Sequence, residues 1–153
     1  MSFDEILNII KYSVGTLGIL AVIFIVAMAI KSLKQMIRRS RLEDEGVNRK
    51  IIESRWSEIE SLIKQEGEMS SKLAIMEADK LLDYTLKSMA LPGETLGERL
   101  KFACYKYDKL KKVWWAHKVR NEMVHESSFK LDKGTARRAI DEFKRALQEL
   151  GAL

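Results

Sequence analysis

The chain has 153 residues with one proline, eight glycines and a single cysteine, a size that fits one small domain plus an appendage. Lysine and arginine outnumber the acids by 27 to 22, a formal net charge of +5 that suits anionic partners such as lipid headgroups or nucleic acid. Because Cys104 is the one cysteine, no disulfide can form within this sequence, which fits a reducing compartment. We expect Cys104 to be a buried small apolar residue. No segment alternates with period two, so the composition predicts an all-α fold.

The first element in chain order is an uncharged stretch of 19 residues, 12–30. As a helix it would rise about 28 Å, close to the ~30 Å thickness of a bilayer's hydrocarbon core. We therefore expect a transmembrane helix over 12–30 after a short extracytoplasmic segment, 1–11. The alternative is a signal peptide, because Ala27-Met28-Ala29 has the small-x-small pattern of a cleavage site, but the acidic N-terminus favours an uncleaved anchor.

Basic residues follow this stretch, whereas Asp4, Glu5 and only Lys11 precede it. The positive-inside rule then predicts a single-pass protein of the cytoplasmic membrane, with its N-terminus outside and its C-terminal domain in the cytoplasm. Segment 31–46 reads as a basic juxtamembrane hinge. Its side chains expected at the membrane surface are Lys31, Lys34, Arg38, Arg39 and Arg41.

The rest of the chain carries amphipathic helical patterns. Residues 47–66 have apolar side chains at a 3.6-residue period, which predicts a connecting helix that ends at Gly67. Ser70 and Ser71 are expected to cap the next helix, which runs to about residue 90, and Pro92-Gly93 breaks it.

Three more helices complete the predicted domain. Thr95 and Glu98 have the spacing of a capping box and predict a helix start. A longer helix is expected over 108–125, and a last one over 135–150 with Gly151 as its C-cap. Short links between such helices predict an antiparallel bundle of four or five helices, with the functional domain at 70–151.

One short motif in the penultimate helix combines residue types that act on phosphodiesters. Arg120 is followed directly by Asn121, and His125 comes five residues after the arginine. An arginine near a histidine is common by chance, but the asparagine directly after it makes the combination rare. A guanidinium, an amide and an imidazole together would hold a phosphodiester and move its protons.

This Arg-Asn-x-x-x-His pattern, on a helix before a closing amphipathic helix, resembles the HEPN superfamily of helical-bundle proteins. The resemblance covers roughly residues 70–151, and the stretches 77–82 and 116–121 also look like single-span bacterial membrane proteins that carry such a domain. It implies a metal-independent ribonuclease, usually a dimer whose two motif helices face each other. Many members are inactive bundles that bind nucleotides or proteins, so the resemblance alone does not establish catalysis.

Helix geometry bears on how such a site would be built. Asn121 and His125 are four residues apart and share a face, whereas Arg120 and His125 are about 140° apart around the helix. A homodimer would bring one chain's arginine to the other chain's histidine. We hypothesise that His125 exchanges a proton with the ribose 2′-OH or the leaving oxygen, that Arg120 braces the phosphate, and that Asn121 fixes either group. The 2′-OH makes the substrate RNA.

A structural alternative stays open, in which Arg120 pairs with an acid, Asn121 braces the helix end and His125 complements the helix dipole. Trp114 and Trp115 would stack on bases or pack in the core and at an interface. The residues that would support a site are His117, Lys118, Glu77 and Asp79.

The sequence predicts neither a metal site nor a cofactor, because no ligand spacing or phosphate-binding loop occurs. Three readings of function therefore remain. They are a tethered ribonuclease, a bundle that binds RNA, a nucleotide or a protein partner such as a nucleotidyltransferase, and a structural membrane protein.

Overall fold

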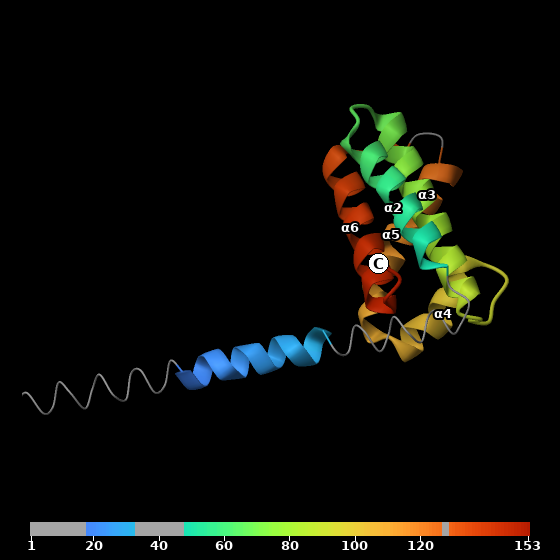
Figure 1. Ribbon diagram of the computed structural model, residues 1–153. Coiled ribbons are helices and arrows are strands. Elements are labelled where there is room, and N and C mark those ends of the chain that lie inside the picture. The colour runs from blue at the N-terminus through green and yellow to red at the C-terminus, as the bar shows by residue number, and fades with distance from the viewer. Residues whose placement is uncertain (1–17, 33–47, 127–128) are drawn as a thin grey trace, which may run out of the picture. The chain divides into compact units, whose positions relative to one another are not determined.

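The computed structural model of the chain describes residues 18–32, 48–126 and 129–153. The chain divides into two compact units, 1–37 and 38–153 (Figure 1). In the first unit, residues 18–32 form a helix whose apolar side chains are exposed.

The expected transmembrane helix needs correction. Within the described residues, no helix is long and apolar enough to cross a membrane. The helical residues 18–32 would rise about 22 Å, short of a hydrocarbon core of ~30 Å. The prediction of a spanning helix over 12–30 is therefore wrong for the part of the chain that the structure describes. Residues 1–17 and the basic side chains Lys34, Arg38, Arg39 and Arg41 lie outside it, and Lys31 is exposed.

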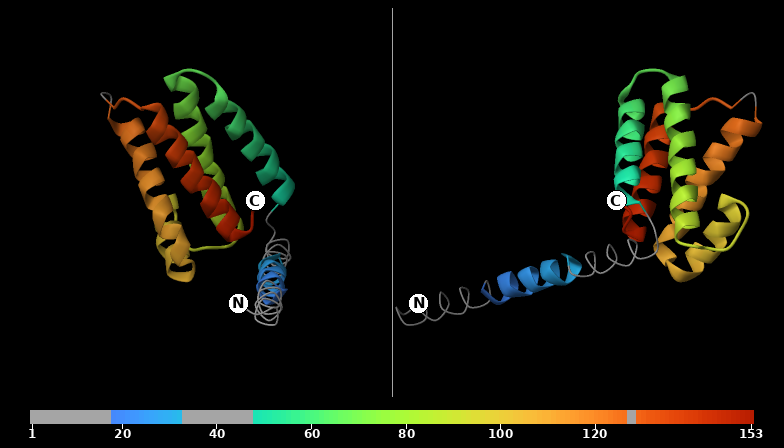
Figure 2. Two further views of the ribbon diagram at one scale, coloured as in Figure 1. Left: turned by 90° about the vertical axis from the view of Figure 1, so that its left-hand side faces the viewer. Right: turned by 45° about the vertical axis from the view of Figure 1, so that its right-hand side comes forward.

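Among the described residues of the second unit, helices joined by short loops are present and no strand occurs, as the all-α prediction expects. Its elements are α2 (Arg49–Lys64), α3 (Glu68–Ser88), α4 (Leu96–Lys106), the 3-10 helix η1 (Asp108–Lys112), α5 (Val113–His125) and α6 (Lys133–Leu150). Figures 1 and 2 show α2 and α5 running in one direction and α3 and α6 in the other, with the short α4 at one end. These four long helices form the antiparallel bundle.

The core lies between α3 and α6, with α2 and α5 packed against them. Phe143 is fully buried on α6, and Leu82 and Ile75 are fully buried on α3. Burying each large apolar side chain contributes about 1.5–3 kcal/mol, so this shared face holds the helices together. Cys104 is buried as expected, and this burial raises the pKa of its thiol.

Two helix starts differ in how well the sequence anticipates them. The capping box at α4 is confirmed, because Thr95 accepts from the backbone of Glu98 and the Glu98 carboxylate accepts from the backbone of Thr95. The expected serine caps of α3 are wrong: α3 begins after Gly67, at φ 118°, and Ser71 donates its hydroxyl back to the Gly67 carbonyl. The positive φ of Gly67 lets the chain turn tightly into α3 without a side-chain cap.

The expected helix over 108–125 is interrupted at its start. Its first five residues form η1, and the α-helix begins at Val113. Leu110 and Val113 are both buried, and three-residue spacing places both on one side of a 3-10 turn. This tight turn sets the direction in which α5 leaves α4. At the other end of the chain, Gly151 is left-handed (φ 82°) and ends α6 as predicted.

Candidate functional site

A closed ring of four polar side chains joins α3 to α5. His117 Nδ1 lies 2.6 Å from Asp79 Oδ1, and Asn121 Nδ2 lies 3.2 Å from His117 Nε2. Arg120 Nη1 donates to Asn121 Oδ1 at 3.0 Å. Arg120 Nε lies 3.3 Å from Asp79 Oδ2, and this ion pair closes the ring.

The order of donors around the ring fixes the state of each member. Because Arg120 can only donate, Asn121 must turn its oxygen to the guanidinium and its NH₂ group to the imidazole. His117 Nε2 is then the acceptor, so the ring proton sits on Nδ1 and is donated to Asp79. The network therefore selects one neutral tautomer of His117. A doubly protonated imidazole would place two donors face to face at Asn121.

The ring is shielded from water on the side of α3. The side chains of Asp79 and His117 are 7% and 13% exposed, and that of Arg120 is 27% exposed. The Arg120 Nε group is buried and makes no hydrogen bond despite its short distance to Asp79. The contact is thus a charge pairing whose geometry leaves one N–H unsatisfied, and the guanidinium is held by its neighbours rather than directed outward.

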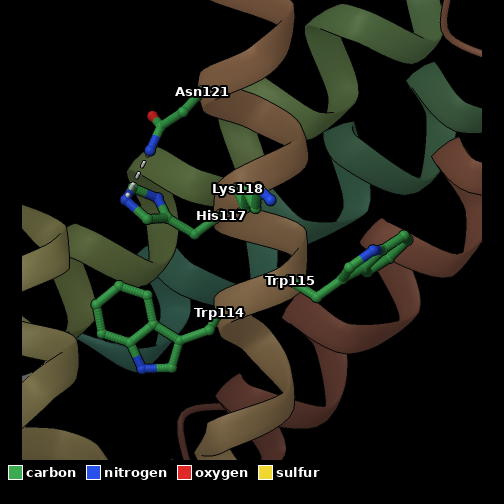
Figure 3. Close-up of a pocket in the computed structure, with 5 residues that line it drawn as sticks. All are labelled: Trp114, Trp115, His117, Lys118 and Asn121. Atoms are coloured by element: carbon green, nitrogen blue, oxygen red, sulfur yellow. Dashed lines mark hydrogen bonds between the residues drawn. The ribbon is translucent and has the colours of Figure 1, made fainter.

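A pocket of about 460 Å³ lies over α5 beside the ring. It is lined by Trp114, Trp115, His117, Lys118 and Asn121, which Figure 3 draws as sticks. In that view Trp114, His117 and Asn121 project to one side of α5 and Trp115 to the other. The volume is within the range of small-molecule and nucleotide sites.

The two indoles are held differently. Trp114 meets the His117 ring edge to face, with centroids 6.2 Å apart, and Cys104 lies against it. The guanidinium of Arg138, on α6, lies 4.2 Å from the centre of the Trp115 ring. This guanidinium covers one face of the indole. The first turn of α4 approaches the same place, because a β-carbon on Gly97 would lie 3.8 Å from His117 Nε2. Three helices therefore position the pocket.

The outward face of α5 carries a stripe, which we define as Trp114, Lys118, Asn121 and His125. These residues follow each other at intervals of four, three and four, so they lie along one side of the helix. The Lys118 side chain is 76% exposed, and its ammonium lies 3.7 Å from Glu122. His125, the last residue of α5, is exposed, and its imidazole has no hydrogen bond or ion pair with any other residue that the structure describes.

The structure brings only part of the predicted site together. Asp79, His117, Asn121 and Arg120 meet in the ring, while His125 stands apart from Arg120 on the same helix. This agrees with the helix geometry, which places those two side chains about 140° apart. A site that uses both groups on one phosphate would need a second chain.

The two acids predicted as supporting residues separate. Glu77 pairs with Lys80 at the surface, whereas Asp79 is buried with Ile75, Ala78 and Leu82 on the inward side of α3. A carboxylate in register with apolar neighbours is a sequence signal for a buried polar partner. Sequence reasoning placed both acids near the motif but did not use that signal to choose between them.

No family model, curated protein or solved structure matches the chain. The likeness to the HEPN superfamily therefore rests on the motif and its placement alone.

Proposed function

We propose that the second unit is a HEPN-like helical bundle that binds single-stranded RNA along the outward face of α5. The observation that carries this proposal is the stripe of an indole, an ammonium, an amide and an imidazole beside an aromatic-lined pocket. Flat indoles stack on bases, and a lysine neutralises a phosphate. Because bases and phosphates recur at every nucleotide, a single-stranded RNA can make stacking and phosphate contacts together along the helix.

The charge around the stripe supports an anionic ligand. The segment 108–125 carries five lysine and arginine residues against two acids. One of those acids, Asp108, is paired with Lys111, and the other, Glu122, faces Lys118. Two of the five cations also pair with acids of other helices, Lys109 with Glu149 and Arg120 with Asp79, so the charge around α5 is only slightly positive, which still favours an anionic ligand.

The ring has a positioning role in this proposal. It holds the Asn121 amide through Arg120 and the His117 imidazole through Asp79, so both pocket-lining groups keep one orientation before a ligand arrives. Groups that are already fixed lose less conformational entropy on binding. Arg120 then acts on the site through its neighbours.

The test is a binding titration of the full chain with a fluorescein-labelled eight-nucleotide uridine RNA, followed by anisotropy at 0.1 M salt. We expect Lys118→Glu to weaken binding by about tenfold or more, because it replaces a phosphate contact with a repulsion. Lys50→Glu makes the same charge change at an exposed position on α2 and should change binding by less than about twofold, since charges beyond ~10 Å are screened. Equal losses in both variants, or no binding by the unsubstituted chain, would overturn the proposal.

Cleavage of the bound RNA is a second candidate function, favoured by the exposed imidazole of His125, which has no partner among the residues that the structure describes. In a pair of chains with apposed α5 helices, His125 of one copy would take the proton of a ribose 2′-OH. The 2′-oxygen then attacks phosphorus, the bond from phosphorus to the 5′-oxygen breaks, that oxygen takes a proton from water, and a 2′,3′-cyclic phosphate results. Arg120, which stays in the ring, would favour the negative charge of the same transition state through its own positive charge and through the Asn121 amide that it orients.

This second candidate has its own readout. RNA incubated with the chain in chelator should yield products with cyclic phosphate ends, and His125→Ala should abolish them while leaving RNA binding within about threefold. Intact RNA at saturating protein would reduce the function to binding. Unchanged cleavage by His125→Ala would remove His125 from the reaction.

A further inference from the structure

A second surface of the bundle, on α4 and η1, exposes aromatic rings among lysines. Phe102 is 52% exposed and Tyr105 is 95% exposed. They are three residues apart on α4 and so project from the same side of that helix. One half-exposed ring beside one almost fully exposed ring makes an apolar patch of the kind that partners cover.

The charged groups around these rings are mostly cations. Lys101, Lys106 and Lys112 are exposed on α4 and η1, and Lys109 is exposed as well but pairs with Glu149 of α6 at 3.2 Å. The acids of the same stretch are engaged elsewhere: Asp108 pairs with Lys111 at 2.8 Å, and Glu98 accepts from the backbone at the start of α4. A ligand that approaches here meets flat apolar rings framed by positive charge.

This surface adjoins the pocket on α5. Lys112 directly precedes Val113, the first residue of α5, and Cys104 of α4 contacts Trp114. Gly97, in the first turn of α4, lies beside the indole of Trp114 as well. A strand that leaves the pocket toward the start of α5 therefore reaches η1 and α4 next.

We infer that the exposed face of α4 and η1 is a stacking platform for a single-stranded polynucleotide, with Phe102 and Tyr105 under the bases and the lysines along the backbone. The chemistry selects this ligand, since a polyanion alone needs no aromatic surface and an apolar protein partner needs no ring of lysines. A duplex keeps its bases stacked inside and offers none to these rings. The inference rests on the proposed function to the extent that α5 and α4 hold the same strand.

The experiment compares two RNA lengths, fluorescein-labelled U5 and U20, on the full chain. The test variant is Phe102→Ser combined with Tyr105→Ser, two exposed positions at which the fold should tolerate the change. Met69→Ser, which removes a 77% exposed apolar side chain from α3, is the matched control. Circular dichroism melting of each variant confirms that it is folded.

The double variant should bind U20 about 10-fold or more weakly, because stacking on an aromatic side chain is worth about 5-fold or more per base. It should bind U5 as the unsubstituted chain does, because the pocket on α5 accommodates the short strand. Lys101→Gln combined with Lys106→Gln should lower the slope of log K against log salt by about 1.4 for U20, since each lost phosphate contact removes about 0.7.

Each outcome decides between the two sites. Loss of U20 binding in the Lys118→Glu variant alone supports α5 and overturns the platform. Loss in the aromatic variant alone, for both lengths, supports the platform and overturns the α5 proposal. An aromatic variant that binds both RNAs normally but changes from dimer to monomer in sedimentation would show that a second copy of the chain covers this surface, and the inference would be wrong.

Discussion

Two polar clusters tie pairs of helices together in this bundle, and they differ in how far water reaches them. At the α3–α5 contact the ring encloses Asp79 and His117, whose side chains are 7% and 13% exposed. At the α2–α6 contact Glu60 accepts from Trp56 and from Lys144, with side chains of Glu60 and Lys144 that are 37% and 41% exposed. Both clusters combine an acid, a cation and an aromatic ring.

The difference teaches what burial adds to the same chemistry. In the open cluster, water competes for every partner and the charges are screened, so the contact is worth little and fixes no orientation. In the closed ring three hydrogen bonds and one ion pair join the four side chains, and removing any member leaves a shielded partner without its contact. The ring also lies beside the pocket on α5. We therefore expect function and the larger stability effects at α3–α5.

The largest effect is expected for Asp79→Ala. This change leaves the imidazole Nδ1–H and the guanidinium without their acid, and loss of one partner of a shielded charge pair costs about 3 kcal/mol. Urea denaturation should show this loss, and Asp79→Asn, which keeps an acceptor, should lose less. A cost below about 1 kcal/mol for the alanine variant would remove the distinction between the two clusters.

Asn121→Leu should be the next most damaging change. It removes the donor to His117 and the acceptor for Arg120, at about 1–2 kcal/mol, since two partly shielded groups lose hydrogen bonds. The same variant should weaken RNA binding, because the amide lines the pocket. Full stability with full binding would show that Asn121 belongs to neither the ring nor the site.

A third variant, at Ala90, lies outside both clusters and serves as a reference for the size of the stability changes. Ala90 follows α3 in a left-handed conformation, with φ 52°, which costs an alanine about 1 kcal/mol. Ala90→Gly should therefore raise the free energy of unfolding by a few tenths to 1 kcal/mol. Glycine removes the cost of the left-handed conformation, but part of this gain is lost because glycine also increases the conformational entropy of the unfolded chain. Ser88→Gly, two residues earlier in the helix, should lower it by about 0.5–1 kcal/mol. A loss of stability in both would contradict the strain at Ala90.

The open cluster should show the smallest effect and a pH dependence. Hydrogen bonds from Lys144 and Trp56 lower the pKa of Glu60 from its ordinary value of 4.5. A lowered pKa in the folded state means that the contribution is complete above about pH 4.5 and is lost as pH falls through the folded value. Because both side chains are more than a third exposed, we expect Glu60→Gln to cost less than about 1 kcal/mol at pH 7.

The cost of Glu60→Gln should shrink as the pH falls below 4.5, because the carboxylate of the folded protein then becomes protonated as well. Thermal melts of the two proteins between pH 3 and pH 7 measure this convergence. A stability difference between the two proteins that grows as the pH falls would contradict a lowered pKa of Glu60 in the folded state.

Much of the bundle follows from local sequence signals. Three of these signals each depend on a few neighbouring residues, and the structure confirms them. They are the capping box at Thr95 and Glu98, the C-cap at Gly151 and the apolar side of α6. Two predictions were wrong: the transmembrane helix, within the residues that the structure describes, and the serine caps of α3. The first was drawn from hydropathy alone, and the second took serines for a start signal where a glycine turn supplies the start.

The ring was less accessible to sequence reasoning, because its partners are far apart in the chain. Asp79 and His117 are 38 residues apart and meet only through the packing of α3 on α5. The spacing of Arg120 and His125 correctly predicts that their side chains leave the helix about 140° apart. It does not identify the acid that holds Arg120. The inward register of Asp79 was the one signal that pointed to that acid.

The three tryptophans of the chain allow the central claim to be measured in one experiment, because Trp56 lies in the open cluster and Trp114 and Trp115 line the pocket. The indole N–H signals of the ¹⁵N-labelled chain would be followed by NMR while the eight-nucleotide uridine RNA is added. If α5 binds RNA, the signals of Trp114 and Trp115 shift saturably and that of Trp56 stays in place. A shift of Trp56 alone, or three unmoved signals at saturating RNA, would contradict the account.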